Sequence, residues 1–434
     1  MTTARPPHIV IAGGGYVGMY TALRLQSKLR RGEARVTVID PRSTMTYQPF
    51  LPEAAAGSLE PRHVVVSLRR TLKKTNVLTA RVASIDAERR TVRVDPPESE
   101  SYDLPYDELV VAMGSVARTL PIPGLAQHGM GFKQIEEAIA LRNHVLDRLD
   151  LATSVVDADA RRAALTFVFV GGGYAGVEAL AETEDMARNA TRYYETIQED
   201  DLRFVLVEAT DRILPEVGPD MGRYTVDRLR DRGIEVRLET RLESAVDRHI
   251  VLSDGEEFDA DTLVWTAGVK ATPVLANSDL PLDDKGRLKA HPNLTVDGRD
   301  HVWTAGDNAA VPDLTNPGAF CSPSAQHAVR QAKTLADNLV RSLRGEELVD
   351  YKHKHVGSVA SLGLHKGVAQ VYGIKLKGFP AWFMHRTYHL SRMPTTSKKA
   401  RVVLDWTLAL FFRRDIVSLG SLHRPRDDFD RANQ

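Results

Sequence analysis

The sequence predicts an α/β fold with two Rossmann-like domains, the second inserted in the first, followed by a C-terminal amphipathic helical segment. Three observations predict it. A glycine-rich turn occurs twice, in residues 8–18 and 166–176. Each turn follows a short apolar run rich in β-branched or aromatic residues and precedes residues with helical apolar spacing, which indicates strand, tight turn and helix. The last part of the chain mixes large apolar and basic residues at helical spacing.

Both turns read G-x-G-x-x-G. The first glycine allows a sharp turn, the second lets the backbone approach a pyrophosphate, and the third lets the helix pack closely on the strand. The phosphates then lie at a helix N-terminus. These positions are Gly13, Gly15 and Gly18 in the first copy and Gly171, Gly173 and Gly176 in the second. One copy alone could be a surface loop or a structural glycine cluster, but two copies predict two bound dinucleotides.

An acidic residue ends the strand that follows each turn. Asp40 closes residues 35–40, and Glu208 closes residues 204–208. Each carboxylate can accept hydrogen bonds from an adenosine ribose hydroxyl, although either acid alone could be an ordinary polar residue at a strand end. Glu208 would repel a 2′-phosphate, so we expect the second site to prefer NADH to NADPH. Arg212 weakens this preference without reversing it.

The other elements follow this frame. Further strands are expected within residues 67–94 and 106–112, and the spacing predicts a helix at 135–149 that leads into the second βαβ unit. Residues 300–307 read as a strand ending in a Gly-Asp pair. A helix then starts near Ser324, with a serine cap. The chain therefore leaves the first domain, forms the second and returns.

These elements set the expected domain boundaries. The first domain comprises residues 1–119 and 293–350, and the second comprises residues 120–292. Residues 351–434 form the C-terminal segment, whose composition differs from that of the domains.

Composition bounds the class of protein. The 434 residues are 43% hydrophobic, and 57 lysines and arginines balance 57 aspartates and glutamates, so nothing indicates a nucleic-acid partner. Cys321 is the only cysteine, and an internal disulfide is impossible. Residues 1–7 lack a signal-like pattern, which favours the cytoplasm. No apolar run reaches the roughly 18–20 residues of a spanning helix, so we expect a protein that lies on a membrane if it meets one.

Several motifs resemble those of the two-dinucleotide-binding-domain flavoproteins, in which FAD binds to the first domain and NAD(P)H to the second. Residues 107–114 and 261–268 resemble the crossover segments that end in Ala-x-Gly or Ala-Gly. Residues 303–307 resemble the second FAD motif, whose aspartate meets the ribityl chain of the flavin. The resemblance implies three further cofactor-binding residues, Gly114, Gly268 and Asp307.

Within that family, three stretches resemble type II NADH:quinone oxidoreductases. Residues 47–57 resemble their Gln-Pro-Leu-Leu segment beside the isoalloxazine, which implies a cofactor contact at Gln48. The step Gly-Val-Glu178 resembles the one whose glutamate lies near the nicotinamide. Ala325 and Gln326 begin a stretch that resembles the A-Q-x-A-x-Q quinone-site motif.

The last of these motifs is altered. Arg330 occupies its sixth position, and the glutamine comes one residue later, at Gln331. Because a helix turns about 100° per residue, Gln331 faces a different direction from a glutamine at position 330.

The residue types limit the chemistry. A disulfide reductase needs a cysteine pair beside the flavin, and a sulfide:quinone oxidoreductase needs several cysteines, so the composition argues against both. What remains is transfer of a hydride from NADH to FAD and of two electrons to an acceptor. No histidine or cysteine cluster has metal-ligand spacing, and we expect no metal. Glu178 is a candidate proton relay with a raised pKa, or else a first-turn acid that stabilises its helix. Gln326 contacts quinone or flavin, or else caps or packs its helix.

The C-terminal segment carries aromatic and basic residues in two helical stretches, 379–393 and 398–414. Residues 375–431 contain 12 lysines and arginines against 5 aspartates, an excess of seven in a neutral chain. This excess favours an anionic surface. Six aromatic residues are expected to enter the interface, with seven basic residues facing lipid headgroups: Trp382, Phe383, Tyr388, Trp406, Phe411 and Phe412, and Arg386, Arg392, Lys398, Lys399, Arg401, Arg413 and Arg414. A dimerisation or core-covering arm is the alternative.

We therefore expect a peripheral, non-proton-pumping NADH:quinone oxidoreductase of a respiratory chain, with bound FAD and NADH as substrate. The resemblance implies attachment to the cytoplasmic face of the cell membrane through C-terminal helices, and a homodimer is expected. One alternative is a soluble flavin reductase that passes electrons from NAD(P)H to a ferredoxin-like protein. Another is a redox-sensing binding protein in which turnover is incidental.

Overall fold

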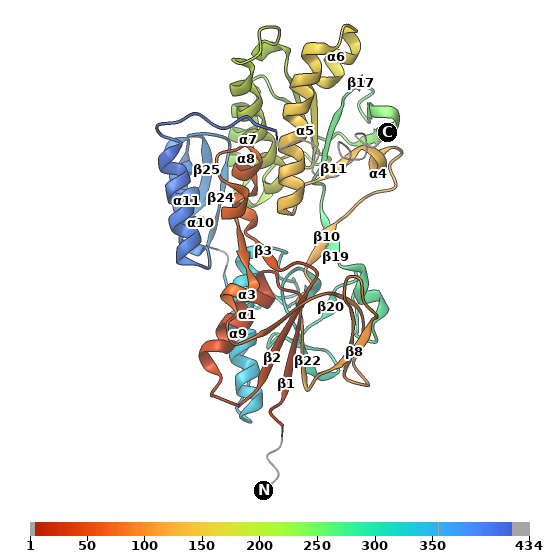
Figure 1. Ribbon diagram of the computed structural model, residues 1–434, viewed down its shortest axis with the longest axis vertical. Helices are drawn as coiled ribbons and strands as arrows, with labels where there is room; N and C mark the ends of the chain where they lie inside the picture. The colour runs from red at the N-terminus through yellow and green to blue at the C-terminus, as the bar shows by residue number, and fades with distance from the viewer. Residues whose placement is uncertain (1–4, 355, 419–434) are drawn as a thin grey trace, which may run out of the picture. The chain divides into compact units, whose positions relative to one another are not determined.

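The computed structural model describes residues 5–354 and 356–418, which divide into two compact units. Unit 1 comprises the chain up to Thr46, Val65–Arg118 and residues 269–354. Unit 2 comprises Tyr47–Val64, Thr119–Gly268 and residues 356–418. Each unit contains one glycine turn and one main parallel sheet, and the elements are labelled in Figure 1.

Unit 1 is built on a six-stranded sheet in the order β21-β22-β9-β1-β2-β5. Every neighbouring pair is parallel except β21 and β22. All five residues of β1 are buried, as expected for a strand of a sheet covered on both faces. Helix α1 packs against α9. The bounds are β1 His8–Ala12, α1 Tyr16–Lys28, β2 Arg35–Asp40, β3 Thr44–Thr46, β4 Val65–Ser67, α3 Leu68–Thr71, β5 Asn76–Thr79, β6 Arg81–Asp86, β7 Thr91–Asp95, β8 Tyr102–Pro105, β9 Glu108–Val111, β10 Ser115–Ala117, β19 Val269–Ala271, β20 Leu288–Lys289, β21 Thr295–Val296, β22 Arg299–Thr304, β23 Ala309–Ala310 and α9 Ala325–Leu343.

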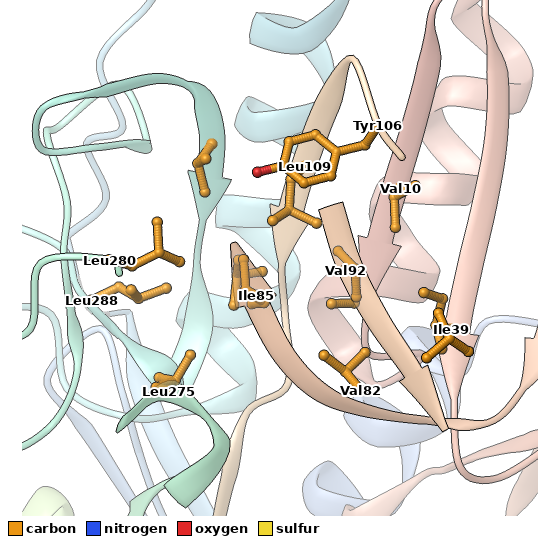
Figure 2. Close-up of a cluster of buried hydrophobic side chains, with 14 of the residues drawn as sticks. Val10, Ile39, Val82, Ile85, Val92, Tyr106, Leu109, Leu275, Leu280 and Leu288 are labelled. Atoms are coloured by element: carbon orange, nitrogen blue, oxygen red, sulfur yellow. The ribbon is translucent and has the colours of Figure 1, made fainter. Parts of the chain in front are cut away.

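The core of unit 1 joins three parts of the chain. Figure 2 shows Val10 and Leu109 of the main sheet, Val82 of the three-stranded sheet β6-β7-β8, and Leu275 from beyond β19 in one buried cluster. Leu280 and Leu288 extend the same cluster. Residues 269–292, which the sequence pattern places in the second domain, therefore belong to unit 1, because their leucines complete this apolar core.

Unit 2 is built on a five-stranded parallel sheet in the order β11-β18-β12-β13-β14. Helix α5 begins at the predicted residue, Ile135, and extends to Ser154. A three-stranded antiparallel sheet, β15-β16-β17, lies in the same unit. The bounds are α2 Leu51–Ala55, α4 Leu125–His128, β11 Gly129–Gly131, α5 Ile135–Ser154, α6 Ala158–Ala164, β12 Thr166–Val170, α7 Tyr174–Thr191, β13 Arg203–Val207, α8 Pro219–Arg230, β14 Glu235–Arg237, β15 Leu242–Ser244, β16 His249–Leu252, β17 Glu257–Asp259 and β18 Thr262–Trp265.

The C-terminal part of unit 2 contains a sheet that the sequence pattern does not predict. Strands β24 (Gly357–Ser361), β25 (Gly367–Val371) and β26 (Ile374–Lys377) form an antiparallel sheet before helices α10 (Phe379–Arg392) and α11 (Thr396–Leu408). Figure 1 shows the two helices side by side, and α10 packs on the sheet. The expectation of an all-helical segment is therefore wrong for residues 357–377. All three strands are short, and β24 and β25 contain several glycines, alanines and serines, so only the four residues of β26 alternate clearly between apolar and polar side chains.

Residues 47–64 also depart from the expected boundary. They lie between two segments of unit 1 in the sequence, yet they pack within unit 2. Helix α2, which they contain, contacts α5 and α7. The buried residues of this short helix, Leu51 and Ala54 among them, explain the assignment, because they find their apolar partners on the long helices of unit 2.

Candidate functional site

The first glycine turn has the geometry that pyrophosphate binding requires. Gly13 has φ +107°, a conformation that favours glycine, and it turns the chain directly after β1. A Cβ on Gly18 would collide with the carbonyl oxygen of Gly13. A Cβ on Gly15 would meet nothing within 4 Å. The first and third glycines are thus required by the fold, whereas the second faces open space at the N-terminus of α1.

The second turn repeats this arrangement. Gly171 has φ +114°, and a Cβ on Gly176 would collide with the carbonyl oxygen of Gly171. A Cβ on Gly173 would again meet nothing within 4 Å. Gly268, the last residue of unit 2 before β19, has φ +89° and equally open surroundings. The protein therefore leaves space for a ligand at both turns.

The two acids are fastened to their turns in the same way. Asp40 Oδ2 accepts a hydrogen bond from Gly14 N at 2.7 Å, and its Oδ1 accepts one from Arg42 N at 2.7 Å. Burial raises the pKa of Asp40, against these two hydrogen bonds, which lower it. Glu208 Oε2 accepts from Gly172 N at 2.6 Å, and its Oε1 accepts from the amide and the hydroxyl of Thr210 at 2.8 Å. Each carboxylate therefore accepts a hydrogen bond from the backbone of its own glycine turn.

The segment after β22 brings together two of the predicted site residues of unit 1, Gly114 and Asp307. Gly114 N donates to Asn308 Oδ1 at 2.9 Å, and Ser115 Oγ donates to Asp307 Oδ2 at 2.7 Å. Gly306 N donates to Gln331 Oε1 of α9 at 2.8 Å. Together these bonds bring Gly114, Asp307 and the first turns of α9 into one part of unit 1.

Helix α9 begins as predicted. Ser324 is its N-cap and accepts from His327 N at 3.2 Å, with Ala325 and Gln326 in the first turn. Gln326 Oε1 lies 3.0 Å from Nε2 of His353, a residue to which the sequence analysis assigned no role.

The two residues at the end of the altered motif have different roles. Gln331 is 1% exposed and holds the Gly306 turn, so it is a packing residue of unit 1. Arg330 is partly exposed and donates from Nη1 to Gln326 O at 2.9 Å. The one-residue shift in the motif therefore turns its glutamine into the core.

Glu178 lies in a buried polar cluster of unit 2 that the sequence did not reveal. Its Oε1 accepts from Ser361 N at 2.8 Å and lies 3.1 Å from Nε2 of His385. Ser361 Oγ also donates to Oε1 of Glu182, one helical turn along α7, at 3.0 Å. The Nη2 atom of Arg414 lies 3.4 Å from the other oxygen of Glu182. Helices α7 and α10 and the segment after α11 therefore supply the ionisable side chains of one cluster, and Ser361 of β24 links its two glutamates.

Burial and charge shift the pKa values in this cluster. Burial is the largest influence on His385 and lowers its pKa, but the negative charges of Glu178, Glu53 and Glu182 outweigh it, and the net pKa is raised. Burial raises the pKa of Glu182 despite nearby Arg414. Burial and the charge of His385 lower the pKa of His389. The cluster can therefore hold and exchange a proton in a region with little access to water.

Glu53 and Arg386 form a second buried pair beside this cluster. Glu53 is 2% exposed, and its Oε2 accepts from Arg386 Nη2 and Trp406 Nε1, each at 2.8 Å. Arg386 was expected to face lipid headgroups and Trp382 to enter the membrane interface, and both expectations are wrong, since both side chains are buried. The side chain of Arg414 is only 10% exposed as well. Charged residues among the aromatic residues of a helical pattern were the only sequence signal for these buried pairs. The same pattern is equally typical of a helix that lies at a membrane interface.

The remaining predicted residue, Gln48, lies in unit 2. Its Nε2 donates to Lys133 O at 3.2 Å. The predicted site residues thus fall into two groups, one in each unit. Unit 1 holds Gly13, Gly15, Gly18, Asp40, Gly114, Asp307, Ala325 and Gln326, and unit 2 holds Gln48, Gly171, Gly173, Gly176, Glu178, Glu208 and Gly268.

Known proteins match this arrangement. Residues 7–332 match the family described as pyridine nucleotide-disulphide oxidoreductase. The chain is 29% identical over 414 residues to a demethylphylloquinone reductase, NdbB, of Synechocystis, covering 94% of this chain and 96% of that protein. It is 29% identical over 383 residues to a type II NADH:quinone oxidoreductase of Staphylococcus aureus, covering 87% and 93%.

Solved structures share the fold. The structure of NDH2 from Plasmodium falciparum in complex with NADH has a TM-score of 0.88 at 20% identity, covering 95% of this chain and 100% of that one. A sulfide:quinone oxidoreductase from Aquifex aeolicus has a TM-score of 0.70 at 15% identity, covering 94% and 96%.

Proposed function

Because this chain belongs to the pyridine nucleotide-disulphide oxidoreductase family, we propose that it is a peripheral membrane flavoprotein that moves a hydride from NADH to FAD and two electrons to a quinone, without pumping protons. The overall reaction consumes NADH, one proton and quinone and produces NAD⁺ and quinol. The observation that carries the proposal is that each unit contains one glycine-rich turn. In each turn the second glycine has free space beside it, and a carboxylate accepts a hydrogen bond from the turn.

The residues of unit 1 fit FAD. Gly15 leaves space for the pyrophosphate at the N-terminus of α1, and Asp40 keeps acceptor capacity for a ribose hydroxyl beyond its two hydrogen bonds. Gly114 and Asp307 would meet the rest of the cofactor. When bound, the flavin supplies hydride acceptance and electron delivery.

The residues of unit 2 fit NADH. Gly173 leaves the corresponding space at the N-terminus of α7, and Glu208 presents a negative charge where a 2′-phosphate of NADPH would lie. Gly268 would be a further contact of this cofactor, whereas Gln48, in the segment that resembles the one beside the isoalloxazine, would contact the flavin. Glu178, buried beside His385, would take up and return protons as electrons pass to the acceptor.

The acceptor is a quinone rather than a disulfide. Burial raises the pKa of Cys321, the only cysteine, to about 11, so its thiol stays protonated at neutral pH. Gln326 and Ala325, at the exposed start of α9, would contact the quinone. Two relatives at 29% identity carry names of quinone-type reductases, which supports this choice.

The outer face of the C-terminal helices would bind the membrane. No helix within residues 5–354 and 356–418 is long and apolar enough to cross a bilayer. Phe383 of α10 is 56% exposed, Leu404 of α11 is 60% exposed and Phe411, just after α11, is 77% exposed, and the basic residues Arg392 and Arg401 are exposed on the two helices. Apolar side chains with a basic rim suit anionic lipid on the cytoplasmic face. A homodimer completes the proposal.

Steady-state NADH oxidation by the FAD-loaded protein tests this function. We expect rapid turnover with a short-chain quinone, stimulation by anionic liposomes and much slower use of NADPH. If NADH reduces the flavin and quinone does not reoxidise it, the proposal fails. Reoxidation by a ferredoxin-like protein would then support the soluble reductase, and absence of turnover with NADH-dependent partner binding would support a redox sensor.

A further inference from the structure

Residues 47–64 pack on α5 and α7 and also contact the C-terminal helices. The hydroxyl of Tyr47 donates to His389 O at 2.8 Å, and the ring of Phe50 lies edge-on to Trp406, with centroids 5.6 Å apart. Further along, His63 Nδ1 lies 2.6 Å from a carboxylate oxygen of Asp405. Residues 47–64 therefore contact α10 at one end and α11 at the other, and their first part, residues 47–57, is the stretch that the resemblance places beside the isoalloxazine.

The centre of this contact is a buried charge pair. The guanidinium of Arg386 donates to Glu53 and lies over two indole rings, 4.1 Å from the centroid of Trp382 and 4.8 Å from that of Trp406. Trp406 donates to the same carboxylate oxygen of Glu53. Cation–π contact and two charge-assisted hydrogen bonds fix the relative position of α2, α10 and α11.

A membrane anchor does not require this pair. Replacing a buried ion pair by apolar residues of similar volume is often neutral or stabilising, whereas loss of one partner strands a buried charge. The lipid-facing surface lies on other residues of the same helices, such as Phe383 and Leu404, which are exposed. The contact between Glu53 and Arg386 therefore lies on the inward face of the C-terminal helices and is separate from their exposed face.

From these contacts we infer that Arg386 is a positioning residue for the acceptor half-reaction. It holds Glu53, and through helix α2 it holds Gln48 and the rest of residues 47–57, in the geometry that electron transfer to quinone needs. The C-terminal helices are then part of the redox machinery as well as the membrane contact. This inference rests on the proposed function, which supplies the quinone as acceptor.

Amide hydrogen exchange on the cofactor-free chain tests the structural step without activity. We expect faster exchange in residues 47–64 of Arg386→Met and unchanged exchange in β12. Arg392→Met is the matched control, because Arg392 is exposed on the same helix and lies over the ring of Tyr388. Equal protection of residues 47–64 in the two variants overturns the inference.

The functional step is tested by measuring the two half-reactions without lipid, using a water-soluble short-chain quinone, so that membrane detachment cannot contribute. For Arg386→Met we expect flavin reduction by NADH to stay within about twofold of the wild type and reoxidation by quinone to slow about 10- to 100-fold. If quinone reoxidises the variant at the wild-type rate, the inference is wrong and the C-terminal helices serve only as an anchor. A wild-type protein that quinone does not reoxidise sinks the proposed function instead, and the exchange result then still decides whether Arg386 holds the segment.

A second variant guards against simple unfolding. The double variant Glu53→Gln with Arg386→Met removes both charges and should recover the melting temperature lost in Arg386→Met. We expect its reoxidation by quinone to stay slow, because the guanidinium contact is still missing. Recovery of both melting temperature and reoxidation would mean that the pair serves stability alone, and the inference would be wrong.

Discussion

The imidazole Nε2 of His385 lies 3.1 Å from Oε1 of Glu178, and both side chains are buried in unit 2. One residue belongs to helix α10 near the C-terminus and the other to the first turns of α7, directly after the second glycine turn. The C-terminal helices thus supply a titratable partner to the glutamate proposed to carry protons.

This pair predicts a specific pH dependence of stability. The pKa of His385 is raised above its usual 6.5, since its acidic neighbours outweigh burial. The protonated histidine therefore stabilises the fold below the unfolded pKa, and this contribution is lost as pH rises through the folded pKa. We expect the free energy of unfolding to fall as the pH rises above about 6.5, and to fall more steeply in the wild type than in His385→Gln.

Urea denaturation at each pH measures this slope. Glu53, Glu182, Arg386, Arg414 and His389 also face the pair, so Glu178→Gln serves as the matched comparison that removes its closest charge. An identical slope in all three proteins would show that the pair is not ionised.

The glycines of the first turn should separate folding from cofactor binding. Gly15→Ala places its methyl group in open space, so we expect the free energy of unfolding of the cofactor-free chain to change by less than about 1 kcal/mol while FAD content drops sharply. Gly18→Ala drives a methyl group into the carbonyl of Gly13 and should cost about 1–3 kcal/mol or more. Flavin absorbance after purification, together with urea unfolding, distinguishes the two. Full FAD occupancy in Gly15→Ala would contradict the assigned role of that glycine.

Glu208 should set the choice of nicotinamide cofactor. Glu208→Gln removes the negative charge but keeps an oxygen that can accept from Gly172. We expect the ratio of kcat/KM for NADPH to that for NADH to rise about tenfold. In the complementary variant, Arg212→Ala, we expect the same ratio to fall below its wild-type value. An unchanged ratio in Glu208→Gln would place the adenosine ribose elsewhere.

The two glutamines at the start of α9 should behave differently. Gln331→Met removes the acceptor of Gly306 N in the interior and should cost about 1–3 kcal/mol of unfolding free energy. Gln326→Met, in the partly exposed first turn, should leave stability nearly unchanged and raise the KM for quinone. Thermal melts and steady-state kinetics on both variants test this. If Gln331→Met raised the KM for quinone and Gln326→Met did not, Gln331 rather than Gln326 would be the quinone contact.

Features that depend on local geometry could be read from the sequence. The glycine turns, the acids Asp40 and Glu208 after their strands, and the serine cap of α9 each involve residues close in the chain or one βαβ unit apart. Backbone conformation and strand order fix such contacts, because a positive φ or a cap has few chemical solutions.

The tertiary structure decided what the polar residues of the helices touch. Glu178 meets His385, Glu53 meets Arg386, and residues 47–64 join unit 2, all through contacts between distant parts of the chain. A charged residue in an amphipathic pattern reads the same whether it faces lipid, water or a buried partner. Only the packing of α2, α7, α10 and α11 selects among these, because burial and pairing are properties of the assembled elements rather than of any one of them.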